Sequence, residues 1–220
     1  MLLSSGPVTG RVFLAVAGNI GSGKTTLTRR LEARLSLRAL YEETADNPYL
    51  EDFYADMPRW AMALQLRFLA TRVGQTKQLL TGGASVIQDR TCYEDAEIFA
   101  ANLAARGEMD ERDWKTYSMI ATQLFDGLPP PHLLVYLRRG PESCRAQIAR
   151  RGRAYEASIP MDYLQDLGDR YDGWYEGYTR GPKMRVSAED HDFLLNEDDL
   201  EALVAQIIEA LPQRPLLFGS

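Results

Sequence analysis

The sequence predicts a single α/β domain in which helices cover both faces of a five-stranded parallel sheet. Short apolar runs alternate along the chain with longer stretches of helical pattern, which is typical of parallel sheets. A glycine-rich stretch also separates the first apolar run from the first helical one. The 220 residues suit one domain, and no linker interrupts the pattern, so we expect that domain to span residues 1–220.

The predicted elements follow one another in the order of strand and helix. The apolar runs predict strands at residues 11–18, 38–42, 84–89, 132–139 and 183–187. Helical patterns lie at residues 25–36, 59–80, 94–106, 110–126, 141–151, 160–179 and 197–210. Gly82 and Gly83 end the long helix, and the three prolines at 129–131 hold the chain extended before the fourth strand.

Composition and charge exclude several classes of partner. The net charge is −6 and the sequence pI is about 5.1, which argues against binding to a nucleic-acid polymer. Cys92 and Cys144 form no metal-binding or disulfide pattern, and two cysteines of this kind are compatible with a reducing cytosol. The apolar run at 11–18 is too short to span a membrane. We therefore expect a cytoplasmic protein without a membrane partner.

The stretch GNIGSGKTT, residues 18–26, fits the phosphate-binding pattern G-x-x-x-x-G-K-[ST], with a predicted strand before it and a predicted helix after it. Glycines let main-chain N–H groups face phosphate oxygens, while Lys24 reaches the outer phosphates and the Thr25 hydroxyl can bind Mg²⁺. A glycine-rich turn that matches by chance is the alternative, and the flanking elements disfavour it. The predicted nucleoside triphosphate contacts are Gly18, Asn19, Ile20, Gly21, Ser22, Gly23, Lys24, Thr25 and Thr26.

Three classes of nucleotide-binding protein share this motif: small-molecule kinases, GTPase switches and mechanical ATPases. The chain has neither an N-K-x-D element nor a D-x-x-G element, which disfavours a GTPase. The third predicted strand ends in one acid followed by arginine, whereas a motor ATPase usually has adjacent acids there. A kinase needs a base, an acceptor pocket, a metal ion and positive charge near the transferred group.

Charged residues follow two of the predicted strands. Glu42 ends the second strand, and Asp89 and Arg90 end the third. Ligands of open α/β sheets bind beyond the carboxyl ends of the strands, so Glu42 can accept a proton there while Asp89 holds Mg²⁺. The alternatives are that Glu42 and Glu43 are solvated loop acids, and that Asp89 and Arg90 cap a helix beginning near Glu94.

Two further groups of side chains are candidates for ligand contacts. Gln65, Phe68 and Arg72 share one side of the long helix, where they can meet a nucleobase. An exposed polar stripe is the alternative. Arg150, Arg151 and Arg153 form a basic cluster that is typical of a mobile segment closing over phosphate. A solvated basic helix end, favourable for the helix dipole, is the alternative there.

Taken in order, these pieces resemble the deoxynucleoside kinase family, especially its bacterial deoxyadenosine/deoxyguanosine kinases. The resemblance runs from GNIGSGKTT to DFLLNEDDL through NPYLEDFY, WAMALQLRFL, QDRTCYEDAEIFA, RRGRAYE and YLQDLGDRYDGWYEGY. It implies a P-loop kinase fold with an arginine-bearing lid at about residues 150–160. It also implies transfer of the γ-phosphoryl group of ATP, with Mg²⁺, to the 5′-hydroxyl of a deoxynucleoside.

The resemblance implies roles for individual residues. Glu42 matches the glutamate that takes the hydroxyl proton, although Glu43 stands where the family usually has proline. Asp89, Arg90 and Thr91 match a D/E-R-S triplet, so Asp89 is a second candidate for the proton or for the metal. The other matches are Tyr54 and Glu156 for the sugar 3′-hydroxyl, Gln65, Arg72 and Asp95 for the base, Trp60 and Phe99 as apolar walls, Arg151 and Arg153 in the lid, and residues 191–193 beside the donor adenine.

Some questions stay open at the level of sequence. The resemblance favours a purine deoxynucleoside, and the residue types alone do not separate adenine from guanine. The rivals are a nucleoside monophosphate kinase of the thymidylate type and a nucleotide-binding regulator without transferase activity. The acid at Glu42 disfavours the first rival, because it would repel a 5′-phosphate. Relatives in this family are usually dimers, so we expect a homodimer formed by the helix at 59–80 or the one at 110–126.

Overall fold

The computed structural model describes residues 11–42, 47–191, 193 and 196–211. Glu43, the neighbour of the predicted proton acceptor, and Asp192 of the segment expected beside the donor adenine lie outside the described residues. Within the described part of the chain, no helix is both long enough and apolar enough to span a membrane.

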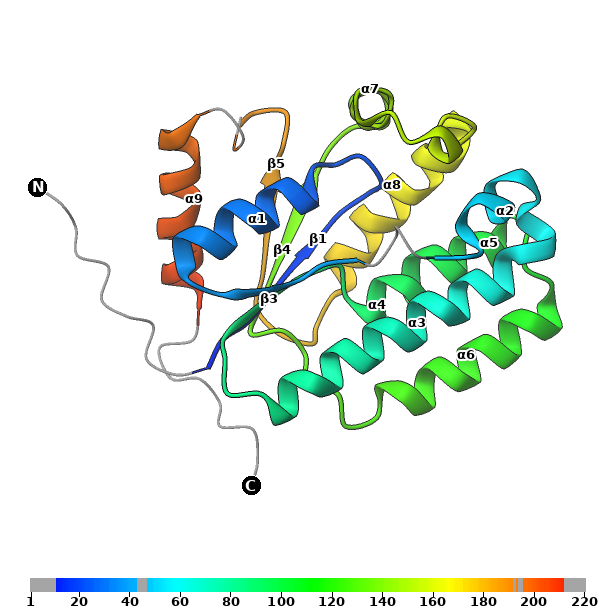
Figure 1. Cartoon of the computed structure of the whole chain (residues 1–220), viewed down its shortest axis with the longest axis horizontal. Helices are drawn as coiled ribbons and strands as arrows, with labels where there is room; N and C mark the ends of the chain where they lie inside the picture. Colours follow the sequence, from blue (N-terminus) through cyan, green and yellow to red (C-terminus); the bar gives the residue numbers. More distant parts are fainter. Residues whose placement is uncertain (1–10, 43–46, 192, 194–195, 212–220) are drawn as a thin grey trace, which may run out of the picture.

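A five-stranded parallel sheet forms the centre of the molecule, which confirms the predicted fold class (Figure 1). The strands are β1 (Phe13–Ala17), β2 (Arg38–Leu40), β3 (Val86–Asp89), β4 (Leu133–Arg138) and β5 (Lys183–Ser187), in the spatial order β2-β3-β1-β4-β5. The strand order reverses beside β1, whose neighbours are β3 and β4. Such a reversal leaves a crevice at the carboxyl ends of the strands, where α/β proteins bind their ligands.

Helices cover the sheet in two layers. Figure 1 shows α1 and α9 over one face and α3, α6 and α8 over the other. In chain order the helical segments are α1 (Lys24–Leu35), α2 (Leu50–Ala55), α3 (Met57–Thr81), α4 (Cys92–Glu94), η1 (Asp95–Ala100), α5 (Ala101–Ala105), α6 (Glu111–Phe125), α7 (Pro141–Arg151), η2 (Ala154–Glu156), α8 (Met161–Gly177) and α9 (Glu197–Ala210).

Strand β1 divides the hydrophobic core between the two layers. Phe13, Ala15 and Ala17 pack with residues of α3, η1, α6 and α8. Leu14 and Val16 pack instead with residues of α1 and α9. Successive side chains of a strand point to opposite faces, so a strand covered on both sides must be apolar throughout. This requirement explains the continuous apolar run, and it fixes the glycine-rich loop after Ala17 at the centre of the sheet.

Helix boundaries follow capping residues that the sequence contains. Asp56 caps α3 by accepting a hydrogen bond from the Arg59 main-chain N–H at 3.2 Å, and Pro58 occupies the first turn. Asn196 caps α9 through the N–H of Asp198 at 3.0 Å. Each cap satisfies main-chain donors that the helix itself leaves unpaired. As a result, α3 begins two residues before the predicted start at 59.

Two segments differ from the prediction. The short helix α2 was not expected, and its apolar side comes from Leu50 and Phe53, both buried. The helix predicted at 94–106 begins at Cys92 and contains the π-helical segment η1 before continuing as α5. A π-helix is a wider turn that often occurs at functional sites. Here it carries Asp95 and Phe99, two of the residues expected to contact substrate.

Candidate active site

The glycine-rich loop crosses from β1 to α1 under tight steric limits. A Cβ atom on Gly18 would lie 2.6 Å from the carbonyl oxygen of Leu137. Gly21 has a φ of 77°, and a Cβ there would lie 2.5 Å from the carbonyl oxygen of Cys144. Any other residue at these two positions would clash with main-chain atoms, so the loop path depends on them. The loop is thereby fixed at the crevice, at the N-terminus of α1.

Lys24 folds back across this loop. Its amine donates a hydrogen bond to the carbonyl oxygen of Asn19 at 2.7 Å, and its side chain is buried. Burial, helped by the positive charge of Arg90, lowers the pKa of Lys24 to about 8. The carboxylates of Asp89, Glu42 and Glu94 offset only part of this effect. A bound triphosphate would add the negative charge that favours the ammonium form.

On the opposite side of the crevice, Glu42 holds two arginines. Its Oε1 atom accepts hydrogen bonds from Arg72 Nη2 at 2.7 Å and from Arg90 Nη1 at 2.8 Å. Burial alone would raise the pKa of Glu42, but Arg90, Arg72 and Lys24 outweigh it and lower the pKa to about 2. Glu42 is therefore ionised and oriented at neutral pH. Because 82% of its side chain is covered, the solvated-acid alternative does not describe it.

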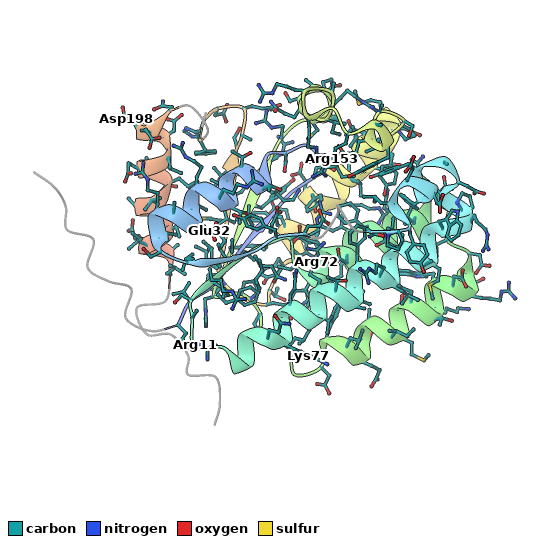
Figure 2. All side chains as sticks on the ribbon, in the orientation of Figure 1. Arg11, Glu32, Arg72, Lys77, Arg153 and Asp198 are labelled. Atoms are coloured by element: carbon teal, nitrogen blue, oxygen red, sulfur yellow. The ribbon has the colours of Figure 1, made fainter. Side chains whose placement is uncertain are left out.

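Arg72 connects this carboxylate to the rest of the site. Its Nε atom donates to Asp95 at 2.6 Å, and its Nη1 atom donates to the carbonyl oxygens of Asp89 and Arg90 at 3.0 and 3.3 Å. Four acceptors on three segments of chain thus share one guanidinium group. Arg72, on α3 (labelled in Figure 2), does not line the cleft described below, whereas its partners Asp95 and Glu42 do. Its direct role is to orient acids that do line the cleft.

The Asp89–Arg90 pair ends β3 but does not cap a helix. Thr91 is the N-cap residue of α4, and it forms a reciprocal capping box with Glu94. Asp89 instead accepts a hydrogen bond from the Thr25 hydroxyl at 2.6 Å. Arg90 adopts a φ of 71°, and its guanidinium lies over the Phe99 ring at 4.2 Å from the centroid. The capping alternative for Asp89 and Arg90 is therefore wrong.

A cleft of about 670 Å³ joins these groups. Among the residues predicted as ligand contacts, fifteen line it: Ile20, Gly21, Lys24, Thr25, Glu42, Tyr54, Gln65, Phe68, Asp89, Arg90, Asp95, Phe99, Arg151, Arg153 and Glu156. Gln65 is buried, and its Oε1 atom has no hydrogen-bond partner among the described residues. A buried amide oxygen without a partner can accept a hydrogen bond from a polar group of a bound ligand.

The sequence analysis missed several apolar walls of this cleft. Leu50 and Phe53 from α2, Leu64 from α3 and Tyr163 from α8 all line it. The spacing of Leu50 and Phe53 was a usable signal, since residues three apart share a helix face. Trp60, which was expected as a wall, does not line the cleft and packs on Tyr49 with ring centroids 5.8 Å apart.

The lid segment follows α7, with Arg151 at the end of that helix and Arg153 (labelled in Figure 2) just before η2. Arg151 Nε donates to Glu156 Oε2 at 2.9 Å, and Arg153 Nη1 lies 3.3 Å from Glu156 Oε1. Both arginines also line the groove over Gly21, Lys24 and the rest of the loop. They can therefore contact Glu156 on one side and bound phosphate on the other.

A second cleft, of about 1130 Å³, lies on the other side of the phosphate loop. Ser22, Gly23 and Thr26 line it together with His191 and Phe193. The arrangement leaves room for the nucleoside part of a triphosphate whose phosphates lie on the loop. Gly18 and Asn19 line neither cleft. They shape the loop, and the Asn19 amide donates to the carbonyl oxygen of Leu164 at 2.9 Å.

Comparison with known proteins agrees with this geometry. A family model described as deoxynucleoside kinase matches residues 14–212, nearly the whole chain. The chain belongs to the deoxynucleoside kinase family. This deoxynucleoside kinase is therefore an enzyme that phosphorylates deoxynucleosides, and ATP is the donor that the family implies.

Several known deoxynucleoside kinases are similar to this chain over most of its length. It is 38% identical to the deoxyadenosine/deoxycytidine kinase of Bacillus subtilis, over 90% of this chain and 92% of that one. It is 35% identical to a deoxyguanosine kinase of Lactobacillus acidophilus, over 91% of each chain. A solved structure of deoxyadenosine kinase from M. mycoides with bound dATP matches with a TM-score of 0.79 at 26% identity, covering 90% of this chain and 99% of that one.

Proposed function

We propose that this kinase transfers the γ-phosphoryl group of ATP to the 5′-hydroxyl of a purine deoxynucleoside in nucleotide salvage. The observation that carries the proposal is that Glu42 shares one cleft with Lys24 on the phosphate loop and with Gln65 on α3. A nucleoside in that cleft has its base beside an amide and its sugar hydroxyl beside a carboxylate. The two reacting groups then meet between Glu42 and Lys24, where phosphoryl transfer depends mainly on position and charge.

In this mechanism Glu42 orients the 5′-hydroxyl and accepts its proton. Arg72 and Arg90 both bond to Oε1, so the proton would go to the other oxygen, Oε2. A pKa of about 2 makes Glu42 a weak base. A loose transition state needs little help from a base before the phosphoryl group has moved, so a late proton acceptor with a low pKa is sufficient. Asp89 is less suited to this role, because its two oxygens would be shared between the Thr25 hydroxyl and the metal ion.

Thr25 and Asp89 have the chemistry to hold Mg²⁺. The Oδ1 atom of Asp89 is buried without a hydrogen-bond partner among the described residues, and Oδ2 meets the Thr25 hydroxyl. No cluster of three or more metal-binding side chains occurs in the described part of the chain. A site of this kind suits Mg²⁺, which keeps several waters and relies on phosphate oxygens. When bound, the ion neutralises charge on the outer phosphates.

The remaining cations and sugar contacts complete the proposal. Lys24, Arg151 and Arg153 offset the charge that develops on the transferred group. Tyr54 and Glu156 lie in the same cleft and would bind the 3′-hydroxyl of the sugar. Glu156 must then share its oxygens between the lid arginines and the sugar, so acceptor binding frees arginine donors for phosphate.

A purine is favoured by the names of the relatives and by the polar side chains of the cleft. The B. subtilis relative is named for deoxyadenosine and deoxycytidine, and the L. acidophilus relative for deoxyguanosine. Gln65 can present both a donor and an acceptor to a base edge, and Asp95 lies beside it as a further acceptor. We also propose that the enzyme acts in the cytoplasm as a homodimer. The candidate interfaces are the faces of α3 and α6.

The test is a coupled assay of ADP release with deoxyadenosine, deoxyguanosine, deoxycytidine and thymidine as acceptors. We expect the highest kcat/KM with a purine. Equal or better turnover of both pyrimidines would overturn the choice of base. Parallel assays with deoxynucleoside monophosphates, and without an acceptor, separate the rivals. A monophosphate kinase would prefer the phosphorylated acceptors, and a regulator would ignore every acceptor.

A further inference from the structure

Glu94 is a buried carboxylate that the mechanism above does not use. It is the last residue of α4, its side chain is 0% exposed, and it does not line the substrate cleft. A carboxylate that is completely removed from water is costly unless several donors compensate it. The identity of those donors therefore indicates what the residue is for.

One oxygen of Glu94 holds the turn that follows β3. Its Oε2 atom accepts hydrogen bonds from the Thr91 main-chain N–H at 2.7 Å and from the Thr91 hydroxyl at 3.1 Å. The residue before Thr91 is Arg90, whose φ of 71° is unfavourable for a side chain with a Cβ atom. The capping box fixes the chain immediately after this strained residue, and it thereby helps to keep the Arg90 guanidinium 2.8 Å from Glu42.

The other oxygen reaches the phosphate loop and α8. Its Oε1 atom accepts hydrogen bonds from the Tyr171 hydroxyl at 2.9 Å and from the main-chain N–H of Gly18 at 3.4 Å. The Nε atom of Arg90 lies 4.0 Å from the same oxygen. Gly18 begins the phosphate loop, so one carboxylate joins the donor side of the site to the turn that orients the acceptor side.

We propose that Glu94 is a positioning residue for phosphoryl transfer, because it ties the first glycine of the phosphate loop to the turn that directs Arg90 toward Glu42. The inference rests on the proposed function, since it assumes that Glu42 and the loop act on the same two substrates. Glu94 itself touches neither substrate. It limits how far the phosphate loop and the Glu42–Arg90 pair can move apart, and phosphoryl transfer is sensitive to that separation.

The substitution Glu94→Gln isolates the link to the loop. The Thr91 N–H needs an acceptor, so the amide oxygen should take the place of Oε2. The amide NH₂ then faces the Gly18 N–H, and that hydrogen bond is lost, whereas the Tyr171 hydroxyl can rotate and accept. The variant also loses the ionic attraction to Arg90. We expect kcat to fall by about 10- to 100-fold, the loss that follows from removing hydrogen bonds to a charged group, with the KM for deoxynucleoside nearly unchanged.

Tyr171→Phe is the matched control. It removes a donor from the same oxygen of Glu94 but leaves the links to Gly18 and Thr91 intact, so kcat should stay close to the wild-type value. A thermal melt of both variants measures their structural cost. If Glu94→Gln lowers only the melting temperature, or if Tyr171→Phe lowers kcat equally, Glu94 is a structural residue and the inference is wrong.

A second pair of variants decides the question if Glu94→Gln does not fold. Thr91→Val removes the hydroxyl that bonds to Oε2, and it should lower kcat without raising the KM for deoxynucleoside. Thr91→Ser restores the hydroxyl and should restore the lost kcat. An unchanged kcat in Thr91→Val would overturn the inference. Wild-type enzyme in the same assay keeps the two proposals distinct, because absence of turnover there counts against the proposed function and not against the role of Glu94.

Discussion

Two groups of charged residues meet in the active site, and they are built differently. On the acceptor side, Arg72 and Arg90 pair with Glu42, and their side chains are 3% and 7% exposed. In the lid, Arg151 and Arg153 pair with Glu156, and their side chains are 35% and 37% exposed. Glu156 itself is only 5% exposed, so the arginines are the exposed partners in the lid. An ion pair that is buried on both sides is costly to break, whereas an arginine that stays in contact with water can exchange partners at a lower cost.

The difference indicates a division of labour. The acceptor side is fixed before substrate arrives, because every buried charge there already has a partner of opposite sign. The contact between the lid arginines and Glu156 can be exchanged when substrates bind. Phosphate can then bind the arginines, and a sugar hydroxyl can bind Glu156. Substitutions on the acceptor side should therefore affect chemistry and stability together, while those in the lid should affect chemistry alone.

The largest effect is expected for Glu42→Gln. The amide keeps the size of the side chain but cannot accept the hydroxyl proton, and it weakens the hold on Arg72 and Arg90. Loss of the group that both orients the hydroxyl and accepts its proton should lower kcat by about 10²- to 10⁴-fold, and steady-state kinetics would measure it.

Glu32→Gln is the control for this prediction. Glu32 accepts hydrogen bonds from the Tyr41 hydroxyl and the Ala39 N–H, close to the same strand but outside the cleft. The Glu32→Gln variant should have a kcat close to that of the wild type. Nucleoside binding by the Glu42→Gln variant, measured by calorimetry, should be nearly intact. Turnover close to wild type in Glu42→Gln would remove Glu42 from the mechanism.

Stability provides the second comparison. Asp95→Asn removes the charge that faces the buried Nε atom of Arg72 at 2.6 Å. Removing one partner of a buried pair costs about 3–5 kcal/mol, and we expect the lower end because Glu42 still faces Arg72. Glu156→Gln weakens two pairs whose arginines are more than one-third exposed, and each such pair contributes at most about 1 kcal/mol.

Denaturant unfolding of both variants would measure these free energies. A similar loss of stability in Asp95→Asn and Glu156→Gln would contradict the distinction between the fixed acceptor side and the exchangeable lid. A change in the denaturant slope would indicate an effect on the unfolded state as well, so the midpoints alone are not sufficient.

Arg151→Met tests the lid by itself. The apolar side chain preserves much of the packing but offers no hydrogen bond to phosphate, so kcat should fall by about tenfold, with little change in unfolding free energy. Arg151→Lys retains the charge without the planar fork and should recover part of the loss. If both variants turn over at the wild-type rate, the lid arginine does not assist the transfer.

The sequence predicted the fold from features that are local. The three central strands, β3, β1 and β4, follow from apolar runs, because strands covered on both faces must be apolar. The phosphate loop follows from the glycine spacing, and the partly exposed edge strands β2 and β5 follow from shorter apolar runs. The π-helical turn at Asp95–Ala100 could not be predicted, since it depends on how the side chains of this segment pack against α3 and α8. The same is true of α2, whose six residues form a helix that is too short to be stable alone.

For the site, the sequence indicated which residues meet but not how they share partners. Gln65 and Arg72 were both expected to contact the base from one side of the helix, yet Gln65 lines the cleft while Arg72 does not and instead bonds to Asp95. For Glu94, the sequence predicted only that a helix begins near it. Its role depends on Gly18 and Tyr171, which are 76 and 77 residues away along the chain, and contacts at that separation leave no local signal.

The smallest expected effect is on the pH dependence, and Lys24 determines its direction. Lys24 must be cationic to bind phosphate, and in the free enzyme its pKa is lowered to about 8. As pH rises through this value the cationic fraction falls, so kcat/KM for ATP should fall to about half near pH 8. Bound triphosphate raises the pKa of Lys24, and kcat at saturating ATP should therefore decline only at higher pH. Glu42, with a pKa of about 2, should add no loss of activity between about pH 5 and 7. If kcat and kcat/KM declined together above the same pH, the decline at high pH would be due to a titrating group that ATP does not contact, and not to Lys24.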